Sequence, residues 1–232
     1  MIALISDIHG NLAALRSVLD RIDAMGITRI VCLGDTAGYY CEINECCDLL
    51  RSRGIYSLLG NHDRYVAFDE TCPRSNSANV CIEYQRAVIT DENKQWLRTL
   101  ESQGSFDGLN IVHGGWNDPV DEYVMPSEAY FSRREGTAFA SGHTHVPCIW
   151  KGTGRTYCNP GSVGQPRDGD ARASFALWNG MDFSLERVEY DICRTQDAMR
   201  AAGFEPYFYE NLSIGARIGG KIDRLAMDRS NA

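Results

Sequence analysis

Three apolar runs near the start of the chain, each followed by a polar turn, constrain the fold most strongly. The runs cover residues 1–6, 29–33 and 55–59. Apolar residues at helical spacing follow the first turn up to Gly26, and a second helix is predicted from about residue 43 to residue 53. Buried strands that alternate with helices form a parallel sheet with helical crossovers.

The pattern changes after residue 145, where short strands separated by turn signals such as Asn179-Gly180 predict an antiparallel portion. The predicted fold class is therefore α/β, and α+β in part. We expect a single domain over residues 1–232, with a polar tail from about Gly219 that frays. The remaining predicted elements are a loop at 69–77, strands at 109–112, 137–141, 149–151, 155–158, 174–178 and 183–190, and helices at 80–88, 91–100, 127–134, 192–202 and after Pro206.

Polar clusters stand at the ends of five predicted strands, and they include all five histidines of the chain. Because parallel strands of one sheet bring their carboxyl ends together, this distribution predicts a shared site. The clusters are Asp7 and His9, Asp35, Asn61 and His62, His113, and His143 and His145.

These carboxylate, imidazole and amide groups are a ligand set suited to Mn, Fe, Zn or Ni. The pairs Asp7 and His9, and His143 and His145, are each two residues apart, so an extended backbone can aim both members into one cavity. Two metal ions roughly 3.5–4 Å apart clamp the attacking and leaving oxygens of an in-line displacement. Such a pair needs a bridging carboxylate, for which Asp35 is the natural candidate, and a water that bridges it is a hydroxide near neutral pH.

The five blocks, which include Gly34-Asp35, Gly60-Asn61-His62-Asp63 and Gly142-His143-x-His145, resemble the calcineurin-like metallophosphoesterases. The resemblance covers the chain to about residue 145, and residues 159–167 resemble a loop of small bacterial phosphodiesterase-like members. It implies a four-layer αββα sandwich of two mixed sheets, flanked by helices, with a dimetal site at its upper edge. One implied metal site contains Asp7, His9, Asp35 and His145, and the other contains Asp35, Asn61, His113 and His143.

The resemblance assigns His62 a different role, over the substrate as phosphate binder and as general acid toward the leaving group. The implied reaction is attack on phosphorus by the metal-bridging hydroxide. One departure concerns the Ser/Thr protein phosphatases, in which Asp-Arg-Gly follows the metal aspartate. Here Gly38 and Tyr39 stand in that region, which argues against protein-phosphatase activity and leaves the phosphate charge to the metals, His62 and Arg167.

Several side chains are weaker predictions for substrate contact. The guanidinium fork of Arg167 suits a phosphate, although a surface pair with Asp168 or Asp170 is an equal alternative. Tyr39 and Trp116 are candidates to stack on a nucleobase, as are Tyr40 and Tyr123, with core or lid packing expected for at least half of these four rings. Trp116 opens an aromatic and acidic segment, residues 116–126, which is a candidate substrate lid.

Composition limits the partners. A formal net charge of −8 gives no basic track for a nucleic acid or an anionic membrane. Without a secretory signal or an apolar run that spans a bilayer, the nine cysteines predict a cytoplasmic protein with reduced thiols. Cys41, Cys46 and Cys47 either bind a soft metal or pack as small apolar residues on a helix. The sequence does not decide whether the protein forms a homo-oligomer.

The function predicted is therefore a dimetal phosphoester hydrolase, with Mn as the expected metal. A small phosphodiester or phosphomonoester is the expected substrate, and a dinucleoside polyphosphate is the runner-up. Two alternatives come from other classes, a non-catalytic metal-binding scaffold and a redox dimetal protein. The first usually lacks ligands or the equivalent of His62, and the second usually needs open, carboxylate-rich coordination.

Overall fold

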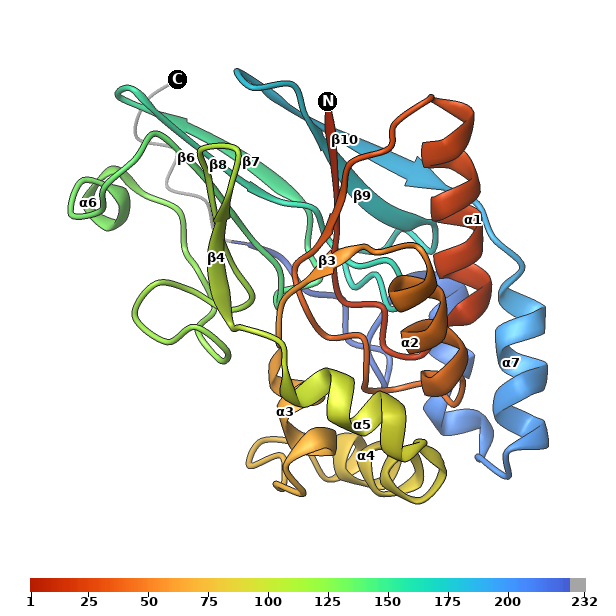
Figure 1. The fold of residues 1–232 in the computed structure, drawn as a ribbon. Coiled ribbons are helices and arrows are strands. Elements are labelled where there is room, and N and C mark those ends of the chain that lie inside the picture. The colour runs from red at the N-terminus through yellow and green to blue at the C-terminus, as the bar shows by residue number, and fades with distance from the viewer. Residues whose placement is uncertain (226–232) are drawn as a thin grey trace.

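The computed structural model describes residues 1–225, which contain two mixed β-sheets of five strands each (Figure 1). The first sheet has the order β10-β9-β1-β2-β3. Its strands β1, β2 and β3 are parallel, whereas β9 is antiparallel to β1 and β10 is antiparallel to β9. The bounds are β1 (Ile2–Ile5), β2 (Ile30–Cys32), β3 (Tyr56–Ser57), β9 (Ala173–Trp178) and β10 (Phe183–Val188).

The second sheet has the order β4-β5-β6-β8-β7. The three central strands β5, β6 and β8 are parallel, and the edge strands β4 and β7 are antiparallel to their neighbours. The bounds are β4 (Gln103–Phe106), β5 (Leu109–Val112), β6 (Ala138–Ser141), β7 (Cys148–Gly152) and β8 (Arg155–Asn159).

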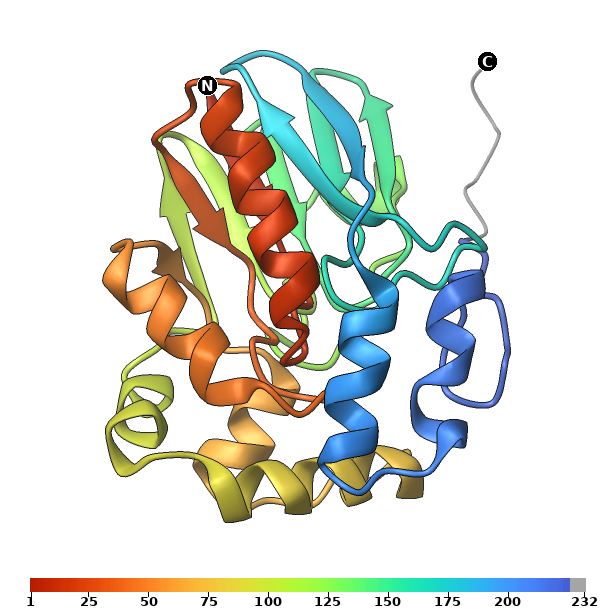
Figure 2. The same cartoon turned by 90° about the vertical axis from the view of Figure 1, so that its right-hand side faces the viewer.

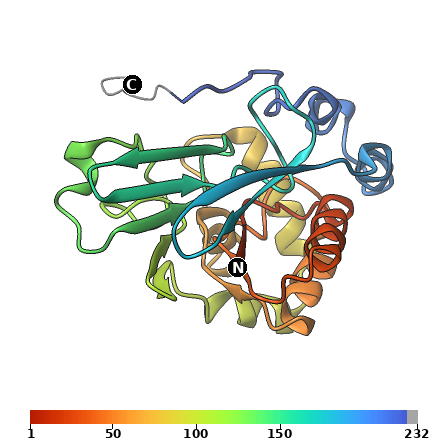
Figure 3. The ribbon, with the colours of Figure 1, turned by 90° about the horizontal axis from the view of Figure 1, so that it is seen from above.

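Helices flank the pair of sheets. Figure 2 shows α1 (Leu12–Ala24) lying over the first sheet, with α2 (Ile43–Ser52) and α7 (Ile192–Ala201) on either side of it. Seen from above, these helices, the first sheet, the second sheet and the short α6 (Glu128–Phe131) follow one another across the molecule (Figure 3). The predicted αββα arrangement of two mixed sheets is confirmed, with a single four-residue helix as the outer layer of the second sheet in the described part of the chain.

The alternation of side chains along β1 explains why this strand is apolar throughout. Ala3 and Ile5 belong to the core beneath α1, whereas Ile2 and Leu4 belong to the core between the two sheets. A strand buried on both faces has no polar alternation, as expected for the centre of a sheet covered on both sides.

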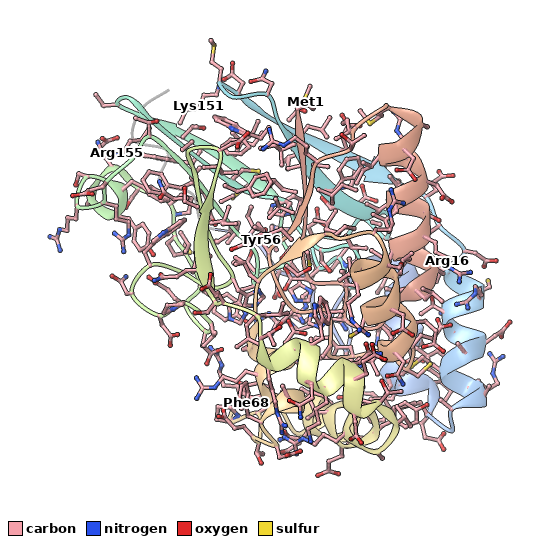
Figure 4. The ribbon with its side chains drawn as sticks, viewed as in Figure 1. Met1, Arg16, Tyr56, Phe68, Lys151 and Arg155 are labelled. Atoms are coloured by element: carbon pink, nitrogen blue, oxygen red, sulfur yellow. The ribbon has the colours of Figure 1, made fainter. Side chains whose placement is uncertain are left out.

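A third group of helices lies at the carboxyl ends of the parallel strands (Figure 1). It consists of α3 (Asn61–Ala67), α4 (Asn76–Val88) and α5 (Asp91–Arg98). Figure 4 marks the two ends of the molecule, with Met1 and Lys151 at one end and Phe68, which follows α3, at the other. Thr90 caps α5, because its hydroxyl accepts a hydrogen bond from the Asn93 backbone N–H.

Several elements differ from the prediction. Strand β4 was not predicted, because its sequence QGSF lacks an apolar alternation. Helix α3 was not predicted either, because its first residues belong to a motif that is typical of a turn. Helix α4 begins four residues earlier than expected, after a Ser75 cap that accepts from the Ala78 N–H. Strand β8 lies in the region predicted to be antiparallel, yet it pairs in parallel with β6.

After α7 the chain continues through two 3-10 helices, Pro206–Phe208 and Glu210–Ile214. The Asp223 backbone N–H donates to the Arg167 carbonyl at 2.7 Å, and Asp223 pairs with Arg217. These contacts fix part of the predicted tail, and its residues 226–232 lie outside the described part of the chain. Within residues 1–225, no helix has the length and apolarity that crossing a membrane requires.

Candidate metal centre

The predicted site residues follow the carboxyl ends of strands from both sheets. Because the two sheets face each other, their loops converge at one end, so the site draws on two sheets rather than on one. None of the eight side chains exposes more than 5% of its surface. The residues are Asp7 and His9 after β1, Asp35 after β2, Asn61 and His62 after β3, His113 after β5, and His143 and His145 after β6.

Most of these residues have a backbone conformation that non-glycine residues rarely adopt. A positive φ costs on the order of 1–3 kcal/mol and persists only where surrounding contacts impose it. Here the Asp35 carbonyl accepts hydrogen bonds from the backbone N–H groups of Ile8 and His9, and the Gly34 carbonyl accepts from Asp7. The positive φ values are 55° at Asp7, 54° at His9, 56° at Asp35, 67° at His143 and 60° at His145.

One cluster contains Asp7, His9 and His145. Nδ1 of His9 donates to the Ala37 carbonyl at 2.8 Å, and Nδ1 of His145 donates to the Gln165 carbonyl at 2.7 Å. In the neutral rings both Nε2 atoms therefore carry lone pairs, and they face each other at 3.0 Å. An Asp7 carboxylate oxygen lies 3.2 Å from Nε2 of His145. Such a group of acceptors requires a cation, so its chemistry fits a divalent metal ion.

A second cluster contains Asp35, His113 and His143. Nδ1 of His113 donates to the Leu33 carbonyl at 2.8 Å, and its Nε2 lies 3.5 Å from Asp35 Oδ2 and 3.1 Å from Asn61 Oδ1. The same Asp35 oxygen lies 3.7 Å from Nε2 of His9. Asp35 thus stands between the two clusters, as the bridging role requires.

The unmet hydrogen-bonding capacity of the carboxylates supports this fit. Asp7 Oδ1 and Asp35 Oδ2 are buried and have no hydrogen-bond partner within residues 1–225. Burial raises the pKa of both carboxyls, but nearby histidines, His145 for Asp7 and His113 for Asp35, outweigh it and hold each pKa below its usual range. Burial lowers the pKa of His9, assisted by His145. These shifts favour charged carboxylates and a neutral imidazole at His9, which are the protonation states of metal ligands. His113 differs, because Asp35 outweighs the effect of burial and raises the pKa of its ring to about 9, so a metal ion would have to displace that proton.

His62 lies beside the clusters, at the start of α3. Its backbone N–H donates to Asp35 Oδ1 at 2.8 Å, and its ring contacts the rings of His9 and Tyr39 at centroid distances of 4.9 and 4.8 Å. Its Nδ1 is buried without a hydrogen-bond partner among the described residues. Burial is the main reason that its pKa falls to about 4. With His9 and Asp35 it also forms a third group of potential ligands, so its position is compatible with either role.

A cavity of about 200 Å³ opens onto both clusters. Arg167 is 4% exposed, and its Nε and Nη2 donate to Gln165 Oε1 at 2.9 and 2.7 Å. The alternative pairs of Arg167 do not form, because Asp168 pairs with Arg187, and Asp170 pairs with Arg172 and lies close to Arg187. The cavity is lined by Asp35, Tyr39, Asn61, His62, Cys72, Arg74, Ser75, Ser77, Tyr123, His143, His145, Arg167, Arg217 and Ile218.

Of the predicted substrate contacts, Tyr39 and Arg167 line the cavity, whereas Trp116 does not. Tyr39 lies against His9 at a centroid distance of 4.7 Å, and the Arg167 guanidinium lies 5.2 Å from the centre of the Tyr39 ring. Trp116 lies elsewhere, packed edge-on against Phe139 at 5.2 Å on the outer face of the second sheet. Trp116 therefore packs against other side chains, as the alternative to base stacking had it.

Sequence reasoning missed several side chains at the site. Arg74 and Arg217 come from connecting segments in which a single arginine carries no signal, yet both line the cavity. Asp63 belongs to the tetrapeptide singled out above, and its carboxylate accepts from the Ala37 and Gly60 N–H groups at 2.7 and 3.0 Å. Tyr123, by contrast, was a candidate for stacking in the predicted lid segment, and it does reach the site, where its ring contacts His143 at a centroid distance of 4.4 Å.

The three clustered cysteines do not join the site. Cys46 and Cys47 are buried on α2, and burial raises the pKa of both thiols well above the usual value. Within residues 1–225, the groups of side chains that could hold a metal contain no cysteine. The position of Cys46 and Cys47 is that of small apolar residues.

Comparisons with known proteins find relatives that match nearly the whole chain. An uncharacterized protein of Methanocaldococcus jannaschii is 34% identical over 93% of this chain and 98% of its own length. A metallophosphoesterase from Sphaerobacter thermophilus is 32% identical, with a TM-score of 0.82 over 92% of this chain and 99% of that chain. A hypothetical protein from Pyrococcus horikoshii shares the fold, with a TM-score of 0.85 at 19% identity over 94% of this chain and 100% of that chain.

The family model described as the calcineurin-like phosphoesterase superfamily domain matches residues 1–180. This range contains both candidate clusters, His62 and Arg167. Membership supports a hydrolase that acts on phosphoester bonds. The chain therefore belongs to the calcineurin-like phosphoesterase superfamily.

Proposed function

We propose that this protein hydrolyses small phosphoesters with the help of two divalent metal ions. One observation carries the proposal: Asp35 Oδ2 lies 3.7 Å from His9 of one buried group of acceptors and 3.5 Å from His113 of the other, and within residues 1–225 neither this oxygen nor Asp7 Oδ1 has a hydrogen-bond partner. Asp7, His9, Asp35 and His145 would hold one ion, and Asp35, Asn61, His113 and His143 the other. When bound, such ions supply an activated water and neutralise charge on the phosphoryl group. Manganese is the metal we propose.

The chain's own residues orient the ligands and the substrate. Carbonyl groups of Leu33, Ala37 and Gln165 fix three of the imidazole rings through their Nδ1–H groups. His62 is the proposed general acid, because no described residue is a hydrogen-bond partner of its Nδ1 and the side chain lines the cavity. Burial lowers the pKa of the free ring to about 4, and a bound phosphoryl anion would raise it again and so charge the donor.

Arg167 is the proposed phosphate clamp. A buried guanidinium normally has a carboxylate partner, yet both of its hydrogen bonds go to the neutral amide of Gln165. Its charge lowers the pKa of His62 and His145, which places it within electrostatic reach of both. An anionic substrate would supply the missing charge.

A small phosphodiester or phosphomonoester is the proposed substrate. The cavity volume of about 200 Å³ suits a small molecule. The family departure at Gly38 and Tyr39 removes the arginine found in protein phosphatases, and a diester carries less charge on its reacting group than a monoester does.

A specific observation supports a dinucleoside polyphosphate as the second candidate. Arg74 and Arg217 line the cavity together with Arg167, and the aromatic residues Tyr39 and Tyr123 line it as well. Such a set suits a chain of phosphates that ends in a base. Arg74 and Arg217 are already paired with Asp121 and Asp223, so the phosphates would have to compete with these carboxylates.

The retained ligands and His62 weigh against a non-catalytic scaffold, and the histidine-rich set weighs against a redox dimetal protein. The nine free cysteines are consistent with the cytoplasmic location that we propose. The deciding experiment is a panel of phosphoesters offered to metal-reconstituted protein. Turnover of at least one phosphoester that stops with chelation supports the proposal, and no turnover with both ions bound rejects it.

A further inference from the structure

The candidate ligand His143 is held differently from the other three. The rings of His9, His113 and His145 each donate Nδ1–H to a backbone carbonyl, which leaves Nε2 for a metal. Within residues 1–225, His143 makes no such bond, and its Nε2 is buried without a hydrogen-bond partner. The group facing that nitrogen is a carboxylate, since Asp121 Oδ1 lies 3.6 Å from it.

The position of Asp121 is fixed by its loop. Gly114 and Gly115 follow the ligand His113, and their N–H groups donate to the carbonyls of Pro119 and Asp118 at 2.7 and 2.9 Å. A Cβ on Gly114 would lie 2.8 Å from the Asp121 backbone nitrogen. The loop therefore reaches its place only because residue 114 has no side chain, and this close approach brings Asp121 to His143.

Arg74 contacts the same oxygen of this carboxylate that faces His143. Its guanidinium pairs with Asp121 Oδ1, donates to the Asp121 carbonyl at 3.2 Å, and lies 5.5 Å from the centre of the Tyr123 ring. Asp121 is three-quarters buried, so the carboxylate is fixed between one cation and one imidazole. Substituting Arg74 removes the cation and leaves the carboxylate beside His143.

We propose that Asp121 is a positioning residue for the second metal site. The Asp121 carboxylate, 3.6 Å from Nε2 of His143, favours a proton on that nitrogen, which is the opposite tautomer from that of the other three rings and leaves Nδ1 for the metal. Metal-bound histidines commonly donate their second N–H to a carboxylate, and loss of that partner typically weakens metal binding about 10–100-fold. The inference rests on the proposed metal centre but not on any reaction.

The first test reads the tautomer. Protein labelled with ¹⁵N in its histidines is loaded with Zn²⁺, and long-range ¹H–¹⁵N spectra identify the protonated nitrogen of each ring. We expect His143 to carry its proton on Nε2, and His9, His113 and His145 to carry theirs on Nδ1. A proton on Nδ1 of His143 overturns the inference, because Nε2 would then be the ligand.

The second test reads metal affinity by titration calorimetry with Mn²⁺ alone. Asp121→Asn should weaken one of the two ions about 10–100-fold and leave the other unchanged. Asp121→Glu should recover part of that loss, and it also serves if Asp121→Asn fails to fold. The comparison variant, Arg74→Gln, keeps the carboxylate beside His143 and should lose less affinity than Asp121→Asn.

Unchanged affinities in Asp121→Asn, or an equal loss in Arg74→Gln, would show that the carboxylate does not act through His143. Both readouts are taken without substrate. If the protein binds two ions but hydrolyses no phosphoester, the proposed function is rejected and this inference is unaffected.

Discussion

Gly38 leaves no room for a side chain beside His9. A Cβ atom at residue 38 would overlap Nδ1 of His9, the atom that donates to the Ala37 carbonyl, and the φ of Gly38 is +143°. The position where the protein phosphatases carry a larger residue is thus closed to any side chain in this protein. Gly38 fixes the ring of a candidate ligand by close packing.

The first prediction follows from that contact. Gly38→Ala should displace His9 and weaken the metal ion held by Asp7, His9 and His145 by about 10–100-fold, the usual cost of disturbing the support of a ligand. The control is Gly26→Ala, which also has a positive φ of +70° but nothing within 4 Å of its added Cβ. Mn²⁺ titration of the two variants separates backbone strain from displacement of His9. Equal affinities in both would contradict the role of Gly38.

The strand and helix order was predictable where both faces of a strand are buried or where a helix has one apolar side. Strand β1 and helices α1 and α2 satisfy these conditions. Strand β4 was not predictable, because its residues are partly exposed at a sheet edge and show no apolar alternation. Helix α3 was not predictable, because its first residues belong to the site motif and do not have high helix propensity.

The proposed metal ligands could be found because each stands next to a strong strand signal. Arg74, Asp121 and Arg217 could not, because long-range packing brings them to the site from connecting segments. The aromatic prediction was ambiguous for the same reason. Tyr39 and Trp116 both follow site motifs, and only the fold decides that one faces the cavity and the other Phe139.

Asp63 should stabilise the fold by joining two site loops. Its carboxylate accepts from Ala37 and Gly60, so Asp63→Ala leaves two buried N–H groups without partners. At roughly 1–3 kcal/mol for each buried group, the loss should be about 2–6 kcal/mol in the free energy of unfolding. Asp63→Asn keeps one acceptor and should lose less. Urea denaturation of metal-free protein measures both, and equal stability of Asp63→Ala and wild type would rule out this role.

Metal dependence is the next prediction. Chelation should abolish turnover, and Mn²⁺ should restore it. Asp35→Asn should weaken both ions, since Asp35 Oδ2 lies within 3.7 Å of imidazoles in both clusters and a neutral amide is a poor bridge between cations. Asp7→Asn is the comparison, because Asp7 belongs to one cluster and should weaken mainly one ion. Full activity in metal-free protein would exclude the dimetal mechanism.

His62→Asn should separate acid catalysis from metal binding. If His62 is the general acid, the variant keeps both ions and loses roughly 10²–10⁴-fold in kcat with a poor leaving group. The loss should be smaller with p-nitrophenolate, which leaves without a proton. An equal loss with both leaving groups would assign His62 to phosphate binding, and a lower metal content would make it a ligand, as its grouping with His9 and Asp35 allows.

Substrate preference is the last prediction. We expect hydrolysis of small phosphodiesters such as bis-p-nitrophenyl phosphate and little activity on phosphopeptides, because the cavity is small and Arg167 is its one buried cation among the described residues. The measurement compares kcat/KM for a diester, a monoester, a dinucleoside polyphosphate and a phosphopeptide in Mn²⁺. A tenfold preference for the phosphopeptide, equal to about 1.4 kcal/mol of transition-state binding, would overturn this choice. The same preference for the dinucleoside polyphosphate, if lost in Arg217→Gln, would show that the paired arginines release their carboxylates to bind the distal phosphates.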